Sequence, residues 1–254
     1  MALLNIQGVS KRFGGLDALR EVTFAVHQGQ IKAVIGPNGA GKTTLFNLVS
    51  GSYRPSEGRV FFSGVDITDK APHRICRMGV GRTFQQSLVF DDMSVLDNVA
   101  VGRYSRTKAG IVSAALSLPL HRREERETLK AAHEALRRVG LDREAGEPAE
   151  NLPMGERHLL EIARALTAEP RLLLLDEPAA GLNDEETGRL AETVRKIRDE
   201  GVTVLLVEHD MTFVMDISDE VVVLDYGRKI AEGPPLMIQD NEEVIKAYLG
   251  EELL

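Results

Sequence analysis

The chain has 254 residues and 43% apolar content, enough to bury a large core in one α/β domain or in two small domains. Its formal net charge of -8 disfavours a protein whose main role is to grip nucleic-acid backbone, because such proteins usually present a basic face. The single cysteine, Cys76, excludes an internal disulfide and, with no zinc-like Cys/His spacing, favours a reducing cytosolic setting.

The first residues, MALLNIQGVSKRF, lack the basic stretch and long apolar run of a cleaved secretory signal. No window of the sequence approaches the ~18 consecutive apolar residues that a membrane-spanning helix needs. We therefore expect any membrane role of this chain to depend on a partner protein.

Short apolar runs rich in β-branched residues alternate with helix-like segments, which predicts an α/β domain with a largely parallel sheet. Polar–apolar alternation at Val22–Val26 and Arg59–Phe62 predicts an antiparallel β layer beside this sheet. Three runs that end in polar or glycine-rich stretches are predicted as strands: Ile31–Ile35, Leu172–Leu175 and Val202–Val207. Ligands of open α/β sheets bind beyond the carboxyl ends of the strands, so we expect these three ends to form one site.

From about Ser87 to Met154 the strand signals fade, and helical periodicity predicts an inserted helical subdomain. Apolar residues recur there at three- and four-residue steps before Gly140, a predicted helix stop, at Leu129, Ala132, Leu136 and Val139. The predicted organisation is therefore a core formed by residues 1–86 and 155–254, interrupted by a helical subdomain at residues 87–154.

Two other segments of the insert have plain structural interpretations. The apolar stretch Ala109–Leu120 is too short to span a bilayer and contains Pro119, so we expect a helix packed on protein. The run HRREER at His121–Arg126 has mixed charges and is interpreted as a solvated helical face rather than a basic binding patch.

Residues 36–44 read GPNGAGKTT and match the phosphate-loop pattern GxxxxGK(S/T), between a predicted strand and the helix-like segment TLFNLVS. The glycines let successive backbone N–H groups and the helix N-terminus point at phosphates. Lys42 would neutralise the β- and γ-phosphates, and the Thr43 hydroxyl would hold Mg²⁺. The predicted nucleotide-binding residues of this loop are Gly36, Pro37, Asn38, Gly39, Ala40, Gly41, Lys42, Thr43 and Thr44.

Two further strand ends carry polar residues that suit hydrolysis of a phosphate bond. The run Leu172–Leu175 continues into Asp176, which would hold Mg²⁺ through water, and Glu177, which would orient or deprotonate the attacking water. His209 follows the third strand and would sense the γ-phosphate and position the water. Taken alone, these are an acidic turn and a strand-end histidine; beside a phosphate loop they predict a catalytic site.

The order of the remaining motifs resembles that of the ABC ATPases over essentially the whole chain, which implies a P-loop NTPase (RecA-like) core. In this resemblance Phe13 is the aromatic residue that stacks on adenine, although a core phenylalanine is the competing interpretation. Gln85 is similar to the glutamine that touches metal and water and moves with the helical insert. Pro178–Asn183 resembles the loop that crosses the dimer interface.

The sequence LPMGE stands in the place of the family signature LSGGQ, which implies that Pro153, Met154, Gly155 and Glu156 bind the ATP of a second subunit. Pro153 replaces the serine whose hydroxyl would contact the γ-phosphate, and Glu156 adds a negative charge where the family has glutamine. A proline suits the first turn of a helix, so the helix N-terminus and the Gly155 N–H can still face an anion. We expect a weaker half-site, and Asn183, where many members have aspartate, adds to this expectation.

Within the family, the stretches RTFQ, VLDNVAVG, LLEIARAL, EPAAGLN and VEHDM and the tail KAYLGEE resemble the ATPases of branched-chain amino-acid importers. The long insert after Gly102 is similar to that of the larger of the two ATPases in such importers. The resemblance implies ATP and Mg²⁺ as cofactors, and two integral membrane permease subunits at the cytoplasmic face of the cell membrane. It also implies a second ABC ATPase, in a heterodimer or a homodimer, and an extracytoplasmic solute-binding protein as an indirect partner; no nucleic acid is expected.

Apolar residues just after Gln85 offer a groove for a short helix of the membrane subunit, with core packing as the alternative: Leu88, Val89, Phe90 and Met93.

Three other functions stay open. A soluble ABC ATPase acting on DNA or ribosomes is disfavoured by the net negative charge and the lack of coiled-coil heptads. A P-loop switch or kinase would leave the signature and His209 without a role, whereas another ABC transporter type would share all of these motifs.

Overall fold

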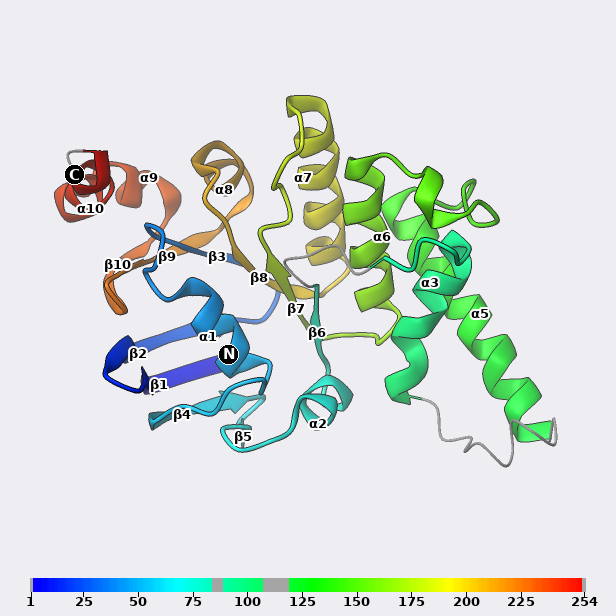
Figure 1. Cartoon of the computed structure of the whole chain (residues 1–254), viewed down its shortest axis with the longest axis horizontal. Helices are drawn as coiled ribbons and strands as arrows, with labels where there is room; N and C mark the ends of the chain where they lie inside the picture. The colour runs from blue at the N-terminus through cyan, green and yellow to red at the C-terminus, as the bar shows by residue number, and fades with distance from the viewer. Residues whose placement is uncertain (1, 84–88, 107–118, 253–254) are drawn as a thin grey trace.

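The structure is a computed structural model that describes residues 2–83, 89–106 and 119–252 (Figure 1). One sheet of the described part is antiparallel and has the strand order β2-β1-β4-β5. Its strands are β1 (Ala2–Phe13), β2 (Leu16–His27), β4 (Glu57–Phe62) and β5 (Val65–Asp66). This sheet confirms the antiparallel layer predicted from the alternating segments at residues 22–26 and 59–62.

The central sheet has the strand order β10-β9-β3-β8-β7-β6. Neighbouring strands from β9 to β6 are parallel, and β10 is antiparallel to β9. The strands are β3 (Ile31–Ile35), β6 (Val80–Arg82), β7 (Leu172–Asp176), β8 (Thr203–Val207), β9 (Glu220–Asp225) and β10 (Arg228–Gly233). The three strands predicted to carry the site are therefore adjacent and parallel, in the order β3-β8-β7, so their carboxyl ends lie at one edge.

Both faces of the central sheet are buried, because helices cover one face and the antiparallel sheet lies beyond the other. In β3, Ile31, Ala33 and Ile35 belong to one apolar cluster, whereas Val34 belongs to the other. Helix α1 (Lys42–Val49) lies between the two sheets, since its residues share a cluster with side chains of β1, β2, β4 and β8. The start of α1 is thereby fixed at the edge where β3 ends.

Helices α3 (Val95–Val101), α5 (Pro119–Val139) and α6 (Met154–Leu166) pack against one another at one end of the molecule (Figure 1). At the opposite end lie α9 (Pro235–Gln239) and α10 (Glu242–Glu252). The other helical segments are α2 (Pro72–Arg77), α7 (Asp184–Asp199), α8 (Met211–Ile217) and the 3₁₀ turns η1 (Gly102–Arg106) and η2 (Ala149–Asn151).

Helix α5 confirms the helix predicted from three- and four-residue apolar spacing. Ala132, Leu136 and Val139 are buried, while Leu129 lies at the margin of the buried face and is 36% exposed. Gly140 ends the helix with a φ of 75°, the left-handed conformation that glycine adopts at helix C-termini. The domain boundaries at residues 86 and 154 stay a prediction.

The structure describes only part of the two remaining segments of the insert, Ala109–Leu120 and His121–Arg126. The segment Ala109–Leu120 lies almost entirely outside the described residues. In the basic run, Arg123 is exposed and pairs with Glu127 at 2.9 Å on the same helix, as a solvated face does. Within residues 2–83, 89–106 and 119–252, no helix is long and apolar enough to cross a membrane.

Candidate functional site

The glycine-rich loop between β3 and α1 has a backbone that only glycine accommodates at two positions. Gly36 has a φ of 148°, and a Cβ there would lie 2.0 Å from the Leu224 carbonyl oxygen. Gly41 has a φ of 101°, and its Cβ would lie 2.6 Å from the carbonyl oxygen of Ala18. The loop is therefore pressed against β9 and β2, and this close packing fixes the direction in which its N–H groups point.

The N-terminus of α1 is open toward this loop. Gly41 is the N-cap and makes no side-chain capping bond, and no acidic side chain occupies the first turn. The ammonium of Lys42 donates to the carbonyl oxygens of Gly36, at 2.6 Å, and Pro37, at 2.9 Å. An uncapped helix start beside a lysine is a site for an anion such as phosphate.

A cavity of about 470 Å³ opens at this helix start. Its lining joins the glycine-rich loop to residues of β1 and β2, to the residue after β7 and to the β9–β10 turn: Phe13, Leu16, Asp17, Ala18, Arg20, Asn38, Gly39, Ala40, Gly41, Lys42, Thr43, Thr44, Glu177 and Tyr226. The structure thus brings the predicted phosphate loop, the predicted adenine-stacking residue and the predicted catalytic carboxylate to one cavity.

Phe13 lies on the wall of the cavity and is not a core residue. Its side chain is 40% exposed, so the core interpretation is wrong. The ring contacts Tyr53 edge-on at a centroid distance of 5.3 Å, and the Lys11 ammonium lies 4.9 Å from its centroid. These neighbours hold the ring on the rim of the cavity, about where the base of a nucleotide would stack.

Asp176, at the end of β7, is fully buried. Its Oδ2 accepts from the Arg82 guanidinium at 3.0 Å, and the same guanidinium donates to Asn47 Oδ1 and Ser50 Oγ of α1. Burial raises the pKa of the Asp176 carboxyl, and the hydrogen bond from Arg82 opposes this rise. The second oxygen, Oδ1, is buried and has no hydrogen-bond partner among the described residues.

That orphaned oxygen fits a magnesium ion. Mg²⁺ takes oxygen ligands, keeps several waters and is usually held by one or two protein groups plus substrate phosphates. Thr43 on the cavity wall offers a hydroxyl, and Asp176 Oδ1 offers a carboxylate oxygen. No cluster of three or more His, Cys, Asp or Glu side chains able to hold a metal occurs in the described part of the chain.

Glu177 lies in an unusual backbone conformation on the cavity wall. Its φ is 50°, in the left-handed region that costs a non-glycine residue on the order of 1 kcal/mol. The conformation is held from β8, because the Glu177 N–H donates to the Val207 carbonyl at 2.9 Å. This left-handed conformation directs the chain out of the sheet, and the Glu177 side chain lies at the cavity rather than in the core.

His209 follows β8, so the prediction that it lies at the same sheet edge is confirmed. Its side chain is 61% exposed, and its Nδ1 lies 3.8 Å from Glu208 Oε2. His209 is not among the described residues that line the cavity, so its contact with a γ-phosphate stays a prediction. Gln85, predicted to touch metal and water, lies outside the described residues.

The signature segment lies apart from the cavity of its own chain, since none of its four residues is in the described lining. Pro153 is the N-cap of α6, one residue before the helix, so its predicted place in the first turn is wrong. Met154 is exposed, Gly155 is buried, and a Cβ on Gly155 would lie 2.8 Å from Glu186 Oε1. The extra charge of Glu156 is partly offset by Arg189 at 3.5 Å.

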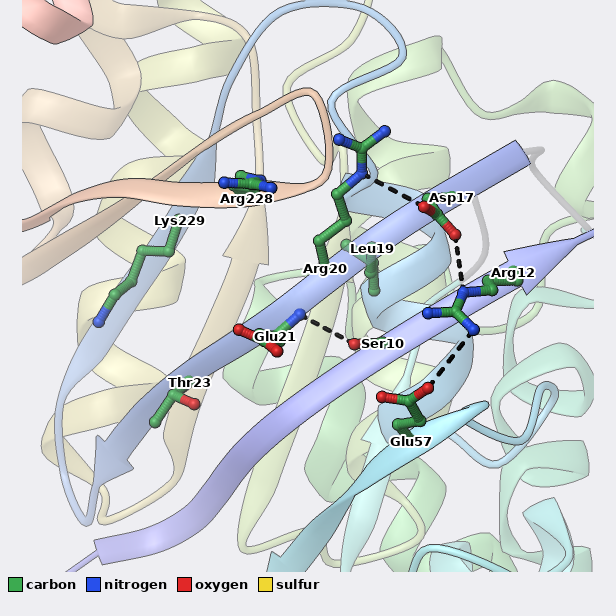
Figure 2. A pocket seen from close by; sticks show the side chains of 10 residues that line it. All are labelled: Ser10, Arg12, Asp17, Leu19, Arg20, Glu21, Thr23, Glu57, Arg228 and Lys229. Carbon is green, nitrogen blue, oxygen red and sulfur yellow. Dashed lines mark hydrogen bonds and ion pairs between the residues drawn. The ribbon is translucent and has the colours of Figure 1, made fainter. Parts of the chain in front are cut away.

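A larger cavity, of about 520 Å³, lies beside the first across β1, β2 and β10 (Figure 2). Four of its charged groups pair with each other: Arg12 lies 2.9 Å from Asp17 and 3.4 Å from Glu57, and Arg20 lies 3.7 Å from Asp17. It has neither a glycine-rich loop nor a helix N-terminus in its lining. We therefore place the candidate site in the smaller cavity, where the glycine-rich loop and the N-terminus of α1 lie together.

Two residues of the site were missed by sequence reasoning. Arg82 gave no signal, because its charge follows a short apolar segment that could equally be a loop. Tyr226 lines the cavity from the β9–β10 turn, where it has a φ of 43° and Gly227 has a φ of 78°. The turn sequence Asp-Tyr-Gly-Arg after an apolar run could have identified the hairpin, since such two-residue turns need positive φ at both central positions.

Comparison with known proteins gives matches over most of the chain. Residues 19–180 match the family model described as ABC transporter, and residues 228–253 match the one described as branched-chain amino acid ATP-binding cassette transporter. The chain is 44% identical over 250 residues to the high-affinity branched-chain amino acid transport ATP-binding protein BraF of Pseudomonas aeruginosa. It is 43% identical over 250 residues to the corresponding protein LivG of Escherichia coli, and each of these alignments covers 98% of both chains.

Among solved structures, the chain is similar to the ADP conformation of MJ1267, an ATP-binding cassette of an ABC transporter. The TM-score is 0.87 at 31% sequence identity, and the match covers 98% of this chain and 99% of that one. The similarity therefore includes both sheets and the helices at the two ends of the molecule.

Proposed function

This chain belongs to the ABC transporter ATPases, and we propose that it binds and hydrolyses ATP to drive uptake of branched-chain amino acids or related small solutes. The family and the fold class are those predicted from the sequence. The observation that carries the proposal is the cavity that joins Phe13, the loop at residues 38–44 and Glu177, in a chain 44% identical to a branched-chain amino acid transport protein over nearly its whole length.

Nucleotide binding follows from the open helix start. The N–H groups of the loop and of the first turn of α1 point at the triphosphate, and the nucleotide base stacks on Phe13. Lys42 now donates to Gly36 and Pro37, so it needs only a side-chain rotation to reach the β- and γ-phosphates.

Thr43 and Asp176 would hold Mg²⁺, and Gln85 would contact the ion and the attacking water. When bound, the ion neutralises charge on the β- and γ-phosphates. Glu177 orients the water and accepts its proton, a role for which its carboxylate lies at the cavity wall. His209, at the neighbouring strand end, hydrogen-bonds the γ-phosphate and fixes the line of attack.

The signature residues serve a second subunit. ATPase subunits of ABC importers work as pairs with membrane permeases, and here Met154, Gly155 and Glu156 begin a helix whose start faces away from the cavity of its own chain. Pro153 offers no hydroxyl, so the helix N-terminus alone would contact the partner's γ-phosphate. We propose a weaker half-site and a heterodimer with a second ABC ATPase.

Coupling to the membrane would occur at the insert, residues 87–154. Phe90 is 48% exposed, and its ring lies under Arg164 at 5.9 Å. The buried Asn98 bonds to both the N–H and the carbonyl of Phe90 and so fixes the loop that presents this ring. An exposed, rigidly held aromatic suits contact with a helix from a permease. That contact would bind the chain to the cytoplasmic face of the cell membrane. Of the other residues predicted for this groove, Val89 is partly buried, and Leu88 lies outside the described residues.

The proposal is tested by identifying the proteins that co-purify with tagged Glu177→Gln chain from detergent-solubilised membranes in the presence of ATP. We expect two integral membrane proteins and a second ATPase, because a chain that binds ATP without hydrolysing it keeps the closed assembly. Ribosomal proteins, or no membrane protein at all, would contradict the importer assignment. The same preparation without ATP is the control for non-specific capture.

A further inference from the structure

Glu208 is a fully buried carboxylate that no step above uses. It directly follows β8, and its two oxygens accept only backbone N–H groups in the hydrogen bonds observed. Oε1 accepts from Ala179 at 2.7 Å, whereas Oε2 accepts from His209 at 3.0 Å and from Asp210 at 3.5 Å. A buried charge is unfavourable unless it is paired or hydrogen-bonded, so these bonds constrain both the side chain and the segments that donate.

The donors belong to two different loops of the site. Ala179 lies two residues after Glu177, in the loop that leads to the N-cap of α7. His209 and Asp210 start the loop into α8, where the Asp210 carboxylate caps the helix by accepting from Phe213 at 3.1 Å. The carboxylate of Glu208 is thus the common attachment of the loop after Glu177 and the loop that carries His209.

The attachment is reinforced on the Glu177 side by backbone bonds. The Glu177 N–H donates to Val207, the residue before Glu208, and the Ala180 N–H donates to the Glu177 carbonyl at 3.2 Å. The left-handed backbone of Glu177 is therefore held by the end of β8 at its N–H and by its own loop at its carbonyl. A movement of the loop at residues 178–183 cannot occur without pulling on the carboxylate that also binds the His209 N–H.

We propose that Glu208 is a positioning residue for ATP hydrolysis: it fixes the Glu177 loop and the His209 loop relative to each other and transmits movement between them. The inference rests on the proposed function, in which both residues act at the γ-phosphate. A partner subunit that contacts residues 178–183 would act on His209 through the Glu208 carboxylate.

A carboxylate is required for this arrangement, because all three donors are N–H groups and both side-chain oxygens accept. Glutamine has the same shape but only one acceptor oxygen, and its NH₂ group would face an N–H donor on one side. It can hold the Ala179 loop or the His209 loop, not both. Burial raises the pKa of the Glu208 carboxyl, and the three backbone hydrogen bonds oppose this rise.

The test is steady-state ATP hydrolysis by the membrane assembly that co-purifies with the tagged full-length chain, carrying either the wild-type residue or Glu208→Gln. We expect kcat to fall at least about tenfold while KM for ATP changes less than about twofold, as for other residues that orient catalytic groups. The matched control is Glu161→Gln, which removes a buried carboxylate of α6 away from the cavity. That variant should keep the wild-type kcat at temperatures where it is folded.

Full turnover in folded Glu208→Gln chain would overturn the inference, as would a kcat loss of the same size in Glu161→Gln or a KM increase that accounts for the lost rate. If Glu208→Gln does not fold, Glu208→Asp decides by the same measurements, because it keeps the charge but withdraws the oxygens by one methylene. Wild type and Glu177→Gln in the same assay separate a failure of the Glu208 inference from a failure of the proposed ATPase function. If wild type is inactive or Glu177→Gln is fully active, the proposed function itself fails.

Discussion

The guanidinium of Arg82 lies 3.0 Å from the carboxylate of Asp176, and this contact joins three parts of the site. Arg82 comes from β6, Asp176 ends β7, and the guanidinium also donates to Asn47 on the helix that follows the phosphate loop and to Ser50, the C-cap of that helix. The pair leaves one Asp176 oxygen without a hydrogen bond among the described residues and fixes the orientation of the carboxylate.

Replacing Arg82 should therefore destabilise the fold as well as the site. Both side chains are largely buried, and removing one partner of such a pair leaves an unpaired charge, at a cost of about 3 kcal/mol. We expect Arg82→Met to lower the free energy of unfolding by this amount in urea titrations. Arg123→Met, which breaks an exposed pair with Glu127, should change it far less, because an exposed pair is screened by water. Equal effects of the two variants would contradict this account of the pair.

Tyr226 should contribute to recognition of the nucleoside part of ATP. Its ring lines the cavity from a turn whose Gly227 N–H is bonded to Ala40 of the phosphate loop at 3.1 Å. We expect Tyr226→Ala to weaken ATP binding about threefold and Phe13→Ala about tenfold, while binding of pyrophosphate is unchanged, because only base contacts are lost. Calorimetric titration measures both ligands.

Tyr104→Ala is the matched control for Tyr226, since both tyrosines are 78% exposed but Tyr104 lies in the insert. It should leave the affinity for ATP unchanged. If Tyr226→Ala weakens pyrophosphate binding as much as ATP binding, the tyrosine acts by shaping the phosphate loop instead of by contacting the nucleoside.

Acid should abolish the stabilising effect of Glu232. Burial alone would raise the pKa of this carboxyl, but hydrogen bonds from Lys229 and from the buried Lys32 hold it below the ordinary value of 4.5. The stabilisation is therefore complete above pH 4.5 and is lost as the pH falls through the lower, folded-state pKa. Glu232→Gln should lower the free energy of unfolding at pH 7 and have a progressively smaller effect below pH 4.5.

Urea titrations from pH 7 to pH 3.5 check this difference, with Glu242→Gln as the control for a strongly exposed carboxylate paired to Lys246. The other carboxyl groups titrate in both proteins and cancel. A difference between wild type and Glu232→Gln that stays constant over the range would show that the lost stability does not come from the ionised carboxylate.

The coupling surface makes a separate prediction. Phe90→Asp should reduce recovery of membrane proteins with the tagged chain by at least about tenfold, because a charge on an exposed aromatic of an interface is poorly tolerated. Leu236→Asp, at an exposed apolar residue on α9 at the opposite end of the molecule, should leave recovery unchanged. Unchanged recovery with folded Phe90→Asp chain would show that the permease does not bind at Phe90.

The sequence predicted the parts of the site that lie at strand ends, because a buried parallel strand is a continuous apolar run and a polar residue after it is conspicuous. The segments Ile31–Ile35 and Leu172–Asp176 are of this kind. By contrast, β1 was not recognised: its pairing with β2 shifts register several times, which disrupts the alternation that marks a half-buried strand.

Burial of charged groups could not be predicted from sequence. Glu208 follows an apolar run as Glu177 does, yet one carboxylate is enclosed by backbone donors and the other lines the cavity. The difference arises from how two loops fold over the sheet edge. Similarly, the place of Pro153 was wrong by one residue, because a proline fits the N-cap and the first turn of a helix almost equally well.

The central claim is that the cavity beside the phosphate loop hydrolyses ATP with Glu177 as the residue that activates water. The most direct test is a single-turnover measurement with labelled ATP and Mg²⁺ on wild-type and Glu177→Gln chains, with bound nucleotide identified after rapid filtration. We predict that Glu177→Gln binds ATP with unchanged affinity, hydrolyses it at least about 100-fold more slowly and retains intact ATP in a dimer. Brisk hydrolysis by Glu177→Gln would contradict the account.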